Sequence, residues 1–469
     1  MAITITGGAT ITGGANIGTG GAPSPSPAPA PGPSDPNFAN VTFMFDGDGS
    51  NAANNNTFTD GSSNGYTVTE NGTVIQGSFS PYSLPSGRAY TGTDGGSIYL
   101  DNDFNNYLSV SAGNFSTTAT NYTFEAWAYW ETAGTGVIIN GITSGNADRF
   151  YLSHVNNTYF FGDGDTNIIS ANVGPPATNT WIHYAVVKNG STTKLYIDGV
   201  EEASTTSSLG TYTIATWQIG SRPGVSAGFP GFLSDVRVVN GTAVYTSAFT
   251  PPTLPQTAVT NTSLLIQGQN STIFDFSGKH NIDTAGDAQI DTSVKKYGTG
   301  SVKFDGTDDR LTCGSSTEFE VGTGDFTIEG WAYNAGDKHS GLFQISSTAG
   351  GLQSNNTLNI AVGMRKNPVR WQMYTDGAYN DAASATWSPN TWYHFAMVRS
   401  SGVAKLYVDG TEVISVNDTS NYTGTNIVVG GYYSTSYLFD GYIDDFRVTK
   451  GVARYTSNFT APTEALPKF

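Results

Sequence analysis

The chain carries one set of sequence motifs twice, in the same order. The matching pairs are Y-T-F-E-A-W-A-Y at 122–129 with F-T-I-E-G-W-A-Y at 326–333, W-I-H-Y-A-V-V-K at 181–188 with W-Y-H-F-A-M-V-R at 392–399, and G-F-L-S-D-V-R-V at 231–238 with G-Y-I-D-D-F-R-V at 441–448. The offsets between the three pairs are 204, 211 and 210 residues, and motifs that recur in one order at nearly constant spacing indicate two copies of one domain. The sequence therefore predicts two related folding units.

Each copy has the sequence pattern of β-strands. Apolar and polar residues alternate in short runs such as 41–45 and 182–187, and these runs are bounded by Gly, Asn, Asp and Ser. The Asp-Gly pair at 198–199, which recurs in the second copy, fits a tight hairpin turn. No segment shows the period and capping residues of an amphipathic helix. We therefore predict an all-β protein with two antiparallel sandwiches, at residues 37–256 and 262–465.

The composition limits the partners of this protein. The net charge is −17, with only 21 Lys and Arg residues and no basic run, so we expect it to bind neither nucleic acid nor anionic lipid. No stretch approaches the ~20 apolar residues of a membrane helix, so we expect no membrane insertion. Residues 1–8 have neither the basic nor the apolar region of a signal peptide, and Cys313 has no cysteine partner within the chain.

The first 36 residues differ from the rest of the chain. Residues 1–21 contain I-T-I-T-G-G, A-T-I-T-G-G and A-N-I-G-T-G-G, which are short β-type units separated by Gly-Gly turns. Such units cannot bury a core alone. We expect either an anchor that is ordered by pairing with other copies or with a scaffold, or a disordered tail. Residues 22–36 alternate proline with small residues and predict a semi-rigid spacer.

The repeated motifs resemble the laminin G-like group of the concanavalin A-like lectin/glucanase fold, a β jelly roll. The motifs that carry the resemblance are T-x-E-x-W-A-Y, W-x-H-x-A-x-V with L-Y-x-D-G downstream, and G-x-[IL]-x-D-x-R-V. The second copy adds D-F-S-G-K-H at 275–280 and V-K-F-D-G at 302–306, with looser counterparts at 60–65 and 98–101. The resemblance implies two tandem jelly rolls. It leaves the function open, because the group includes lectins, adhesion modules, structural domains and hydrolases.

The repeated glutamate does not have the pattern of a catalytic residue. Hydrolases of this fold use paired carboxylates with the signature E-x-D-x-x-E, which is absent here. Glu125 and Glu329 have no recurring acidic partner at i+2 or i+4, the positions that would share a strand face with them. His183 and His394 recur on an alternating strand and are interpreted as structural. We therefore predict no catalytic residues and no enzymatic activity.

Binding surfaces are expected in the loops that differ between the copies, at about 144–168, 222–230, 335–356 and 431–438, because binding loops diverge more freely than the core. Aromatic side chains in these loops are able to stack on sugar rings. The candidate ligand-binding residues are Tyr151, Tyr159, Phe160, Tyr432, Tyr433 and Tyr437. The alternative interpretation is that these rings only anchor their loops.

Calcium is the one cofactor that the resemblance implies, and oxygen-rich turns supply calcium ligands in proteins. Acidic turns occur at 46–51, 101–103 and 305–309. The candidate metal ligands are Asp46, Asp48, Asp101, Asp235, Asp305 and Asp445, of which Asp101 and Asp235 recur as Asp305 and Asp445. Asp-Gly runs that form plain turns are the alternative.

The ends of the two copies, G-T-A-V-Y-T-S-A-F-T-P-P and G-V-A-R-Y-T-S-N-F-T-A-P, resemble those of such domains in tail and fibre proteins of marine bacteriophages. We expect a virion structural protein, a tail, neck or capsid fibre exposed on the particle. Its N-terminal segment would contact other virion proteins or form a homotrimer, and its domains would face cell-surface glycans. Two alternatives stay open: a secreted bacterial adhesin or carbohydrate-binding protein, and a polysaccharide-degrading enzyme.

Overall fold

The computed structural model describes residues 4–5, 9–10, 34–82, 94–116, 119–145, 147–155, 157–163, 166–206, 212–222, 228–269, 271–347, 352–353, 357–375 and 377–468. Within these ranges the protein consists of strands, with single-turn 3-10 helices at Phe38–Asn40, Thr317–Phe319 and Thr435–Tyr437. The predicted all-β class is confirmed. None of the described helices has the length and apolarity needed to cross a membrane.

Most of the predicted anchor (1–21) and of the predicted spacer (22–36) lies outside the described residues. The exceptions in the anchor are β1 (Thr4–Ile5) and β2 (Ala9–Thr10), which pair antiparallel with each other.

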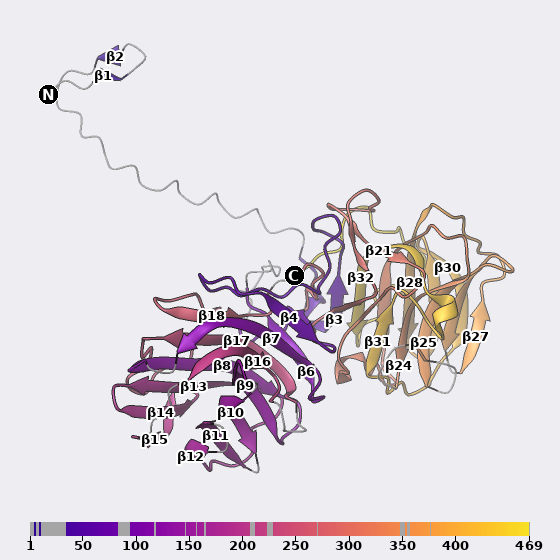
Figure 1. Ribbon diagram of the computed structural model, residues 1–469. Helices are drawn as coiled ribbons and strands as arrows, with labels where there is room; N and C mark the ends of the chain where they lie inside the picture. Colours follow the sequence, from indigo (N-terminus) through magenta and orange to yellow (C-terminus); the bar gives the residue numbers. More distant parts are fainter. Residues whose placement is uncertain are drawn as a thin grey trace.

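The first sandwich consists of two antiparallel sheets (Figure 1). The first sheet has the order β12-β11-β10-β9-β16-β7-β4, and its strands are β4 (Val68–Asn71), β7 (Tyr107–Ser116), β9 (Gly136–Thr143), β10 (Asp148–Val155), β11 (Thr158–Asp163), β12 (Thr166–Ala171) and β16 (Thr213–Ile219). The second has the order β15-β14-β13-β8-β17-β6-β5, and its strands are β5 (Ile75–Gly77), β6 (Ser97–Asp101), β8 (Asn121–Trp130), β13 (Trp181–Asn189), β14 (Thr192–Ile197), β15 (Val200–Thr205) and β17 (Pro230–Asn240).

The second sandwich repeats this arrangement. One sheet has the order β19-β22-β31-β24-β25-β26-β27, and its strands are β19 (Asp283–Ala285), β22 (Arg310–Thr312), β24 (Ser340–Ser346), β25 (Leu358–Arg365), β26 (Arg370–Thr375), β27 (Ala378–Asp381) and β31 (Asn426–Val429). The other has the order β20-β21-β32-β23-β28-β29-β30, and its strands are β20 (Gln289–Asp291), β21 (Ser301–Asp305), β23 (Phe326–Asn334), β28 (Trp392–Ser400), β29 (Val403–Val408), β30 (Thr411–Asn417) and β32 (Asp440–Lys450). Each sandwich encloses its own apolar core.

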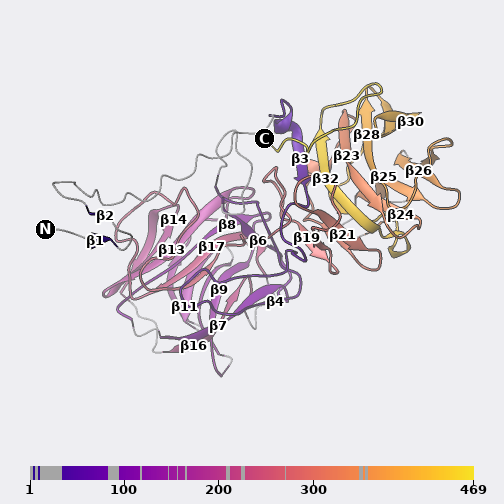
Figure 2. The ribbon, with the colours of Figure 1, turned by 90° about the horizontal axis from the view of Figure 1, so that it is seen from above.

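Each sandwich is completed by a strand from the other copy of the repeat. The strand β3 (Val41–Phe45) opens the first copy in sequence, but it pairs antiparallel with β32 of the second sandwich. The strand β18 (Thr262–Ile266) opens the second copy and pairs with β17 of the first sandwich. Figures 1 and 2 both show β3 lying beside β32, and Figure 1 shows β18 beside β17.

The exchanged strands contribute side chains to the cores that they enter. Phe43 lies opposite Val448 and is buried in the second core, and Leu264 lies opposite Val238 and is buried in the first. Burying one such side chain stabilises a fold by about 1.5–3 kcal/mol. Each sandwich therefore depends on a segment that the sequence assigns to the other copy.

Two equivalent aspartates hold the exchanged strands. Asp275 accepts a hydrogen bond from the backbone N–H of Met44 at 3.0 Å, and Asp60 accepts one from the N–H of Leu265 at 3.0 Å. Each also caps its own turn, because Asp275 accepts from Ser277 N and Asp60 from the serine at the corresponding position. The loosely matched motifs at 60–65 and 275–280 thus have the same structural role.

The predicted boundaries at 37–256 and 262–465 need correction at their first strands. The segment that follows β3 also stays with the second sandwich, where Asn55 bonds to the backbone of Ile273 and Ile282. Asp35, which falls within the predicted spacer at 22–36, is buried in the second sandwich. Hydrophobic alternation identifies a strand, but it cannot determine which of two equivalent partners the strand pairs with.

The exchange predicts crossed effects of matched core substitutions. Phe43→Ala should weaken the second sandwich and Leu264→Ala the first, each by about 3–4 kcal/mol, because each opens a cavity in the core that it enters. Hydrogen exchange resolved by strand is the measurement. Faster exchange of β8 and β13 in Phe43→Ala, with β23 and β28 unaffected, would contradict the exchange.

Candidate functional site

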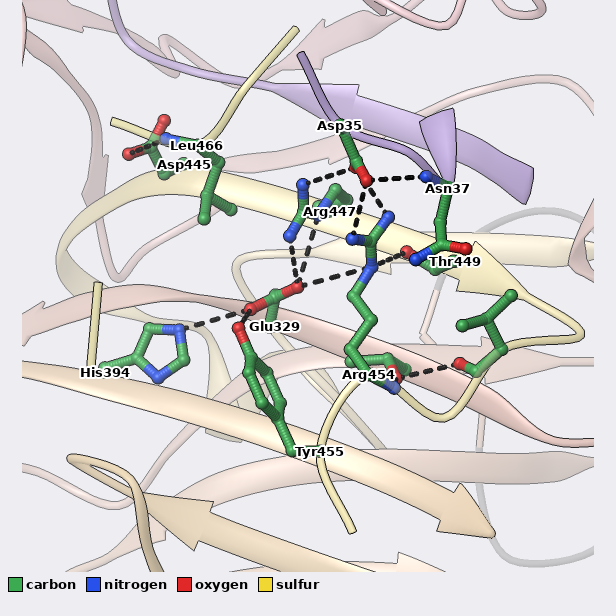
Figure 3. Close-up of polar contacts among 12 residues, drawn as sticks. Asp35, Asn37, Glu329, His394, Asp445, Arg447, Thr449, Arg454, Tyr455 and Leu466 are labelled. Atoms are coloured by element: carbon green, nitrogen blue, oxygen red, sulfur yellow. Dashed lines mark hydrogen bonds and ion pairs between the residues drawn. The ribbon is translucent and has the colours of Figure 1, made fainter. Parts of the chain in front are cut away.

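The repeated glutamate lies in a buried ionic cluster (Figure 3). In the second sandwich, Glu329 on β23 accepts hydrogen bonds from Arg447 Nη2 at 2.7 Å and from Tyr455 Oη at 2.8 Å, and its Oε2 lies 3.4 Å from His394 Nε2. Arg447 also donates to Asp35 at 3.0 Å. The cluster therefore includes a residue of the segment that leads into the exchanged strand β3. Arg454 donates to the same Asp35 carboxylate at 2.7 Å.

The first sandwich contains the same cluster with two changes, one of which is Val244 at the position of Arg454. Glu125 accepts from Arg237 Nη2 at 2.6 Å and from Tyr245 Oη at 2.8 Å, with His183 Nε2 at 3.3 Å. Gln256, which stands where Asp35 stands in the second cluster, donates to Glu125 at 3.2 Å. The repeated Glu, His and Arg residues are therefore one structural unit in both copies.

These carboxylates are not accessible to a substrate. Glu329 and Glu125 are 0% and 2% exposed. Burial by itself would raise the pKa of Glu329, but Arg447 and His394 outweigh it and hold that pKa well below its usual range. The same balance, with His183 and Arg237, lowers the pKa of Glu125. Loss of such a buried, paired carboxylate would leave its arginine partner uncompensated and destabilise the fold. A carboxylate that is held in its charged form is also poorly suited to proton transfer.

A different set of residues forms an open site on the second sandwich. Tyr432, Tyr433 and Tyr437 come together around a pocket of about 490 Å³. The structure thus brings together the three aromatic residues that the sequence analysis proposed in the second copy. The other residues that line the pocket are His339, Arg365, Lys366, Asn367, Gln372 and Tyr379. We call this site the tyrosine pocket.

Hydrogen bonds fix the floor of the tyrosine pocket. Tyr432 is buried, and its hydroxyl donates to Gln372 Oε1 at 2.8 Å and lies 2.6 Å from His339 Nε2. The glycine Gly341 lies under Tyr432, where a Cβ would come within 2.0 Å of the ring. Tyr379 stands at the rim with 38% of its surface exposed. The pocket therefore has one fixed tyrosine at its base and a more accessible one at its edge.

Cations line the tyrosine pocket and their counter-ions lie outside it. Arg365 Nη1 is 2.5 Å from Asp381 Oδ2, and Lys366 pairs with Asp337. Among the described residues that line the pocket, none is Asp or Glu. Sequence reasoning missed Arg365, Lys366, His339 and Tyr379. The signal for the first two was the run M-R-K-N-P-V-R at 364–370, which places three cations within six residues of an acidic chain.

The aromatic candidates of the first copy do not form such a pocket. Tyr151 is 4% exposed, donates to Asn167 at 2.8 Å and has Arg222 stacked over its ring. Tyr159 is 3% exposed, bonds to another tyrosine hydroxyl inside the sandwich, and is one of the residues that line a separate pocket of about 300 Å³. Phe160 is half-buried on β11. Their contacts match the alternative interpretation, in which these rings anchor the local structure.

The acidic candidates separate into groups. Exchange of β3 brings Asp46 and Asp48 to Lys468, which pairs with Asp46 and lies 3.2 Å from Asp48 Oδ2. Asp445 is buried nearby and accepts from Leu466 N at 3.2 Å. A lysine ammonium thus supplies the positive charge at this group.

The remaining acidic candidates lie apart from that group. Asp235 is buried against Tyr82 and Gln267, and burial raises its pKa to about 6. Asp101 caps its own turn through Asp103 N at 3.1 Å.

Asp305 belongs to the one described group with the spacing of a metal site. Its carboxylate and those of Asp287 and Asp309 have oxygens within 4.8 Å of one another. Asp309 already accepts backbone hydrogen bonds from Asp305 and Asp287 at 2.8 and 2.7 Å. Calcium binding stays a prediction.

Removing the charge at Glu329 should destabilise the second sandwich. Glu329→Gln leaves Arg447 buried with one carboxylate partner instead of two. The free energy of unfolding should fall by about 3–5 kcal/mol in chemical denaturation. The matched variant Glu125→Gln should have a similar effect on the first sandwich. Values under 1 kcal/mol for both would contradict the structural role.

The same cluster predicts acid sensitivity. Because the folded pKa of Glu329 lies below its unfolded value of about 4.3, its stabilising effect is complete above that pH and is lost as the pH falls toward the folded pKa. Denaturation at pH 7 and pH 3 should show a smaller loss of stability in Glu329→Gln than in the wild-type protein.

Comparison with known proteins agrees with this fold. A family model described as the concanavalin A-like lectin/glucanases superfamily matches residues 101–244 and 305–454, together more than half of the chain. Both exchanged strands lie outside the matched residues. No curated protein sequence matches the chain.

Two solved structures illustrate the similarity. Domains LG4-5 of the mouse laminin alpha1 chain share 14% identity, with coverage of 84% of this chain and 95% of that one and a TM-score of 0.27. Domain 4 of an extracellular arabinanase from Geobacillus stearothermophilus, in complex with arabinotriose, shares 15% identity, with coverage of 38% and 87% and a TM-score of 0.30. From the two family matches, the chain belongs to the concanavalin A-like lectin/glucanases superfamily, as two laminin G-like domains in tandem.

Proposed function

We propose that this protein binds saccharides and that the tyrosine pocket is a sugar-binding site. The observation that carries the proposal is the convergence of Tyr379, Tyr432, Tyr433 and Tyr437 around one pocket of about 490 Å³. A pyranose ring presents C–H groups that pack on aromatic faces and hydroxyls that need hydrogen-bond partners at its edge. Tyrosine side chains supply the first, and the polar residues of the pocket supply the second.

The charge of the pocket favours sugars that carry an acidic group. The chain has only 21 Lys and Arg residues and a net charge of −17, yet Arg365 and Lys366 both line this pocket. The Arg365 guanidinium uses Nη1 and Nε for Asp381 and Asn367 O. A planar guanidinium has five N–H donors, so donors remain for a ligand carboxylate.

Binding without hydrolysis is the activity that the side chains support best. The glutamate of the repeated strand motif, Glu125 and Glu329, is buried and ion-paired in both copies, and the tyrosine pocket has cations where a glycosidase needs a pair of carboxylates. We therefore propose that the protein is not an enzyme. Release of reducing ends from a polysaccharide would favour the polysaccharide-degrading alternative.

We further propose that the protein is displayed on a bacteriophage particle, as a tail, neck or capsid fibre that contacts cell-surface glycans. The Gly-rich repeat and the proline-rich segment at its N-terminus support an anchor and a spacer, and the anchor would contact other virion proteins or form a homotrimer. A secreted adhesin is the second candidate. Co-purification with virus particles supports the fibre, whereas exposure on the producing cell supports the adhesin.

Substitution in the pocket should reduce sugar binding. Tyr437→Ala removes one aromatic wall and should weaken binding about 2- to 12-fold, because an aromatic contact contributes about 0.5–1.5 kcal/mol. A glycan array identifies the ligand and calorimetry measures its affinity. Tyr442→Ala is the matched control, since Tyr442 is half-buried on the same sandwich outside the pocket. Equal affinities for the two variants would contradict the assignment.

A further inference from the structure

A second cavity, of about 500 Å³, lies between the two sandwiches. Its first wall carries Phe79, Tyr129, Glu131 and Phe232, and its second wall carries Lys279 and the segment 314–318. We call it the interdomain cleft. It is separate from the tyrosine pocket, with which it shares no lining residue.

Buried contacts hold the two walls of the interdomain cleft together. Asn281 of the second sandwich is 2% exposed, accepts a hydrogen bond from Phe79 N at 3.1 Å and donates to Ser97 O at 3.0 Å. Ser78 donates to the carbonyl of Asp275 at 2.7 Å. Together with the exchanged strands, these bonds fix the width of the cleft.

The first wall is aromatic. The ring of Phe79 lies 5.0 Å from that of Tyr129 and 4.7 Å from that of Phe232, both in edge-to-face geometry. The β5 and β20 registers place Ser293 of the second copy where Phe79 stands in the first. The first copy therefore has an additional aromatic ring, that of Phe79, on the wall that faces the cleft, and the second copy has a serine at this position.

Glu131 stands at the edge of this wall and has no cationic partner among the described residues. It is half-buried, and burial raises its pKa, which a hydrogen bond from Tyr99 lowers only in part. No Lys, Arg or His in the described part of the chain forms an ion pair with it. Lys279, on the opposite wall, is paired with Glu318 at 3.1 Å. The second copy has no carboxylate at the position of Glu131, where Ala335 stands, just as it has no aromatic ring at the position of Phe79.

We propose that the interdomain cleft binds a ligand that carries an ammonium group, such as an amino sugar or a choline headgroup. A partly desolvated carboxylate without a counter-ion is costly, and a ligand ammonium beside Glu131 removes that cost. Aromatic rings attract cations through their faces and pack against the adjacent C–H groups, which makes Phe79, Tyr129 and Phe232 suitable neighbours for the same group. The lining supports a positively charged ligand, since Glu131 and Glu318 stand against one lysine. The other basic residue of the lining, His280, is 2.9 Å from Asp275 Oδ2 through its Nδ1.

Calorimetry on the full-length protein tests this proposal with glucosamine, choline and N-acetylglucosamine. Glucosamine, choline or both should bind. The probe that binds shows whether the ligand is an amino sugar or a choline headgroup. The neutral N-acetylglucosamine should bind at least 10-fold more weakly than the probe that binds. Glu131→Gln should weaken that probe at least 10-fold, and Phe79→Leu should weaken it while keeping the bulk of the side chain.

Two controls separate this site from the rest of the protein. Glu318→Gln removes a lining carboxylate that already has a partner and should change affinity less than 2-fold. Tyr437→Ala should leave ammonium binding unchanged, so failure of the tyrosine pocket and failure of the cleft are distinguishable. Absence of binding by both ammonium probes, equal binding of the neutral sugar, or unchanged affinity in a folded Glu131→Gln variant would overturn the proposal.

Discussion

The reciprocal exchange of first strands is the constraint on which the rest of this structure depends. β3 gives Val41, Phe43, Met44 and Phe45 to the second sandwich, and each of these side chains is at most 1% exposed. At about 1.5–3 kcal/mol for each buried side chain, this strand represents a large part of the stability of an ordinary domain. Asp35 adds a charged contact at the start of the same segment, where Arg447 and Arg454 hold it. Neither copy of the repeat is therefore complete without the other.

This arrangement explains why the two sites differ in kind. The tyrosine pocket lies within the second sandwich and is built from the loops and strand ends of one domain. The interdomain cleft exists only because the sandwiches are held at a fixed separation, with Asn281 bonded to the backbone of both Phe79 and Ser97. A flexible connection between two independent domains would not keep Glu131 opposite the second wall. The exchange thus turns two copies of one domain into a molecule with a site that neither copy has alone.

Much of the fold could be predicted from the sequence, because a repeat and an alternating pattern are local signals. The tyrosines of the loop at 431–438 were also visible, since three aromatic residues lie in one short, variable segment. The pairing partner of β3 could not be predicted from the sequence. The strands β17 and β32 are equivalent in the two copies and offer β3 the same apolar face. In the sequence, Glu131 is only a residue without an acidic counterpart in the second copy. Its position in a cleft depends on how the two sandwiches face each other, which no periodicity encodes.

Cross-linking of paired cysteines tests the strand exchange most directly. In a protein with Cys313 replaced by Ser, Val41→Cys and Thr449→Cys should form an intramolecular disulfide under mild oxidation, because these residues are partners in the β3–β32 register. Val41→Cys with Val239→Cys, the equivalent position on β17, should not. Peptide mapping of the monomeric species identifies the bond. A disulfide between positions 41 and 239, with none between 41 and 449, would show that each copy keeps its own first strand and would contradict the account.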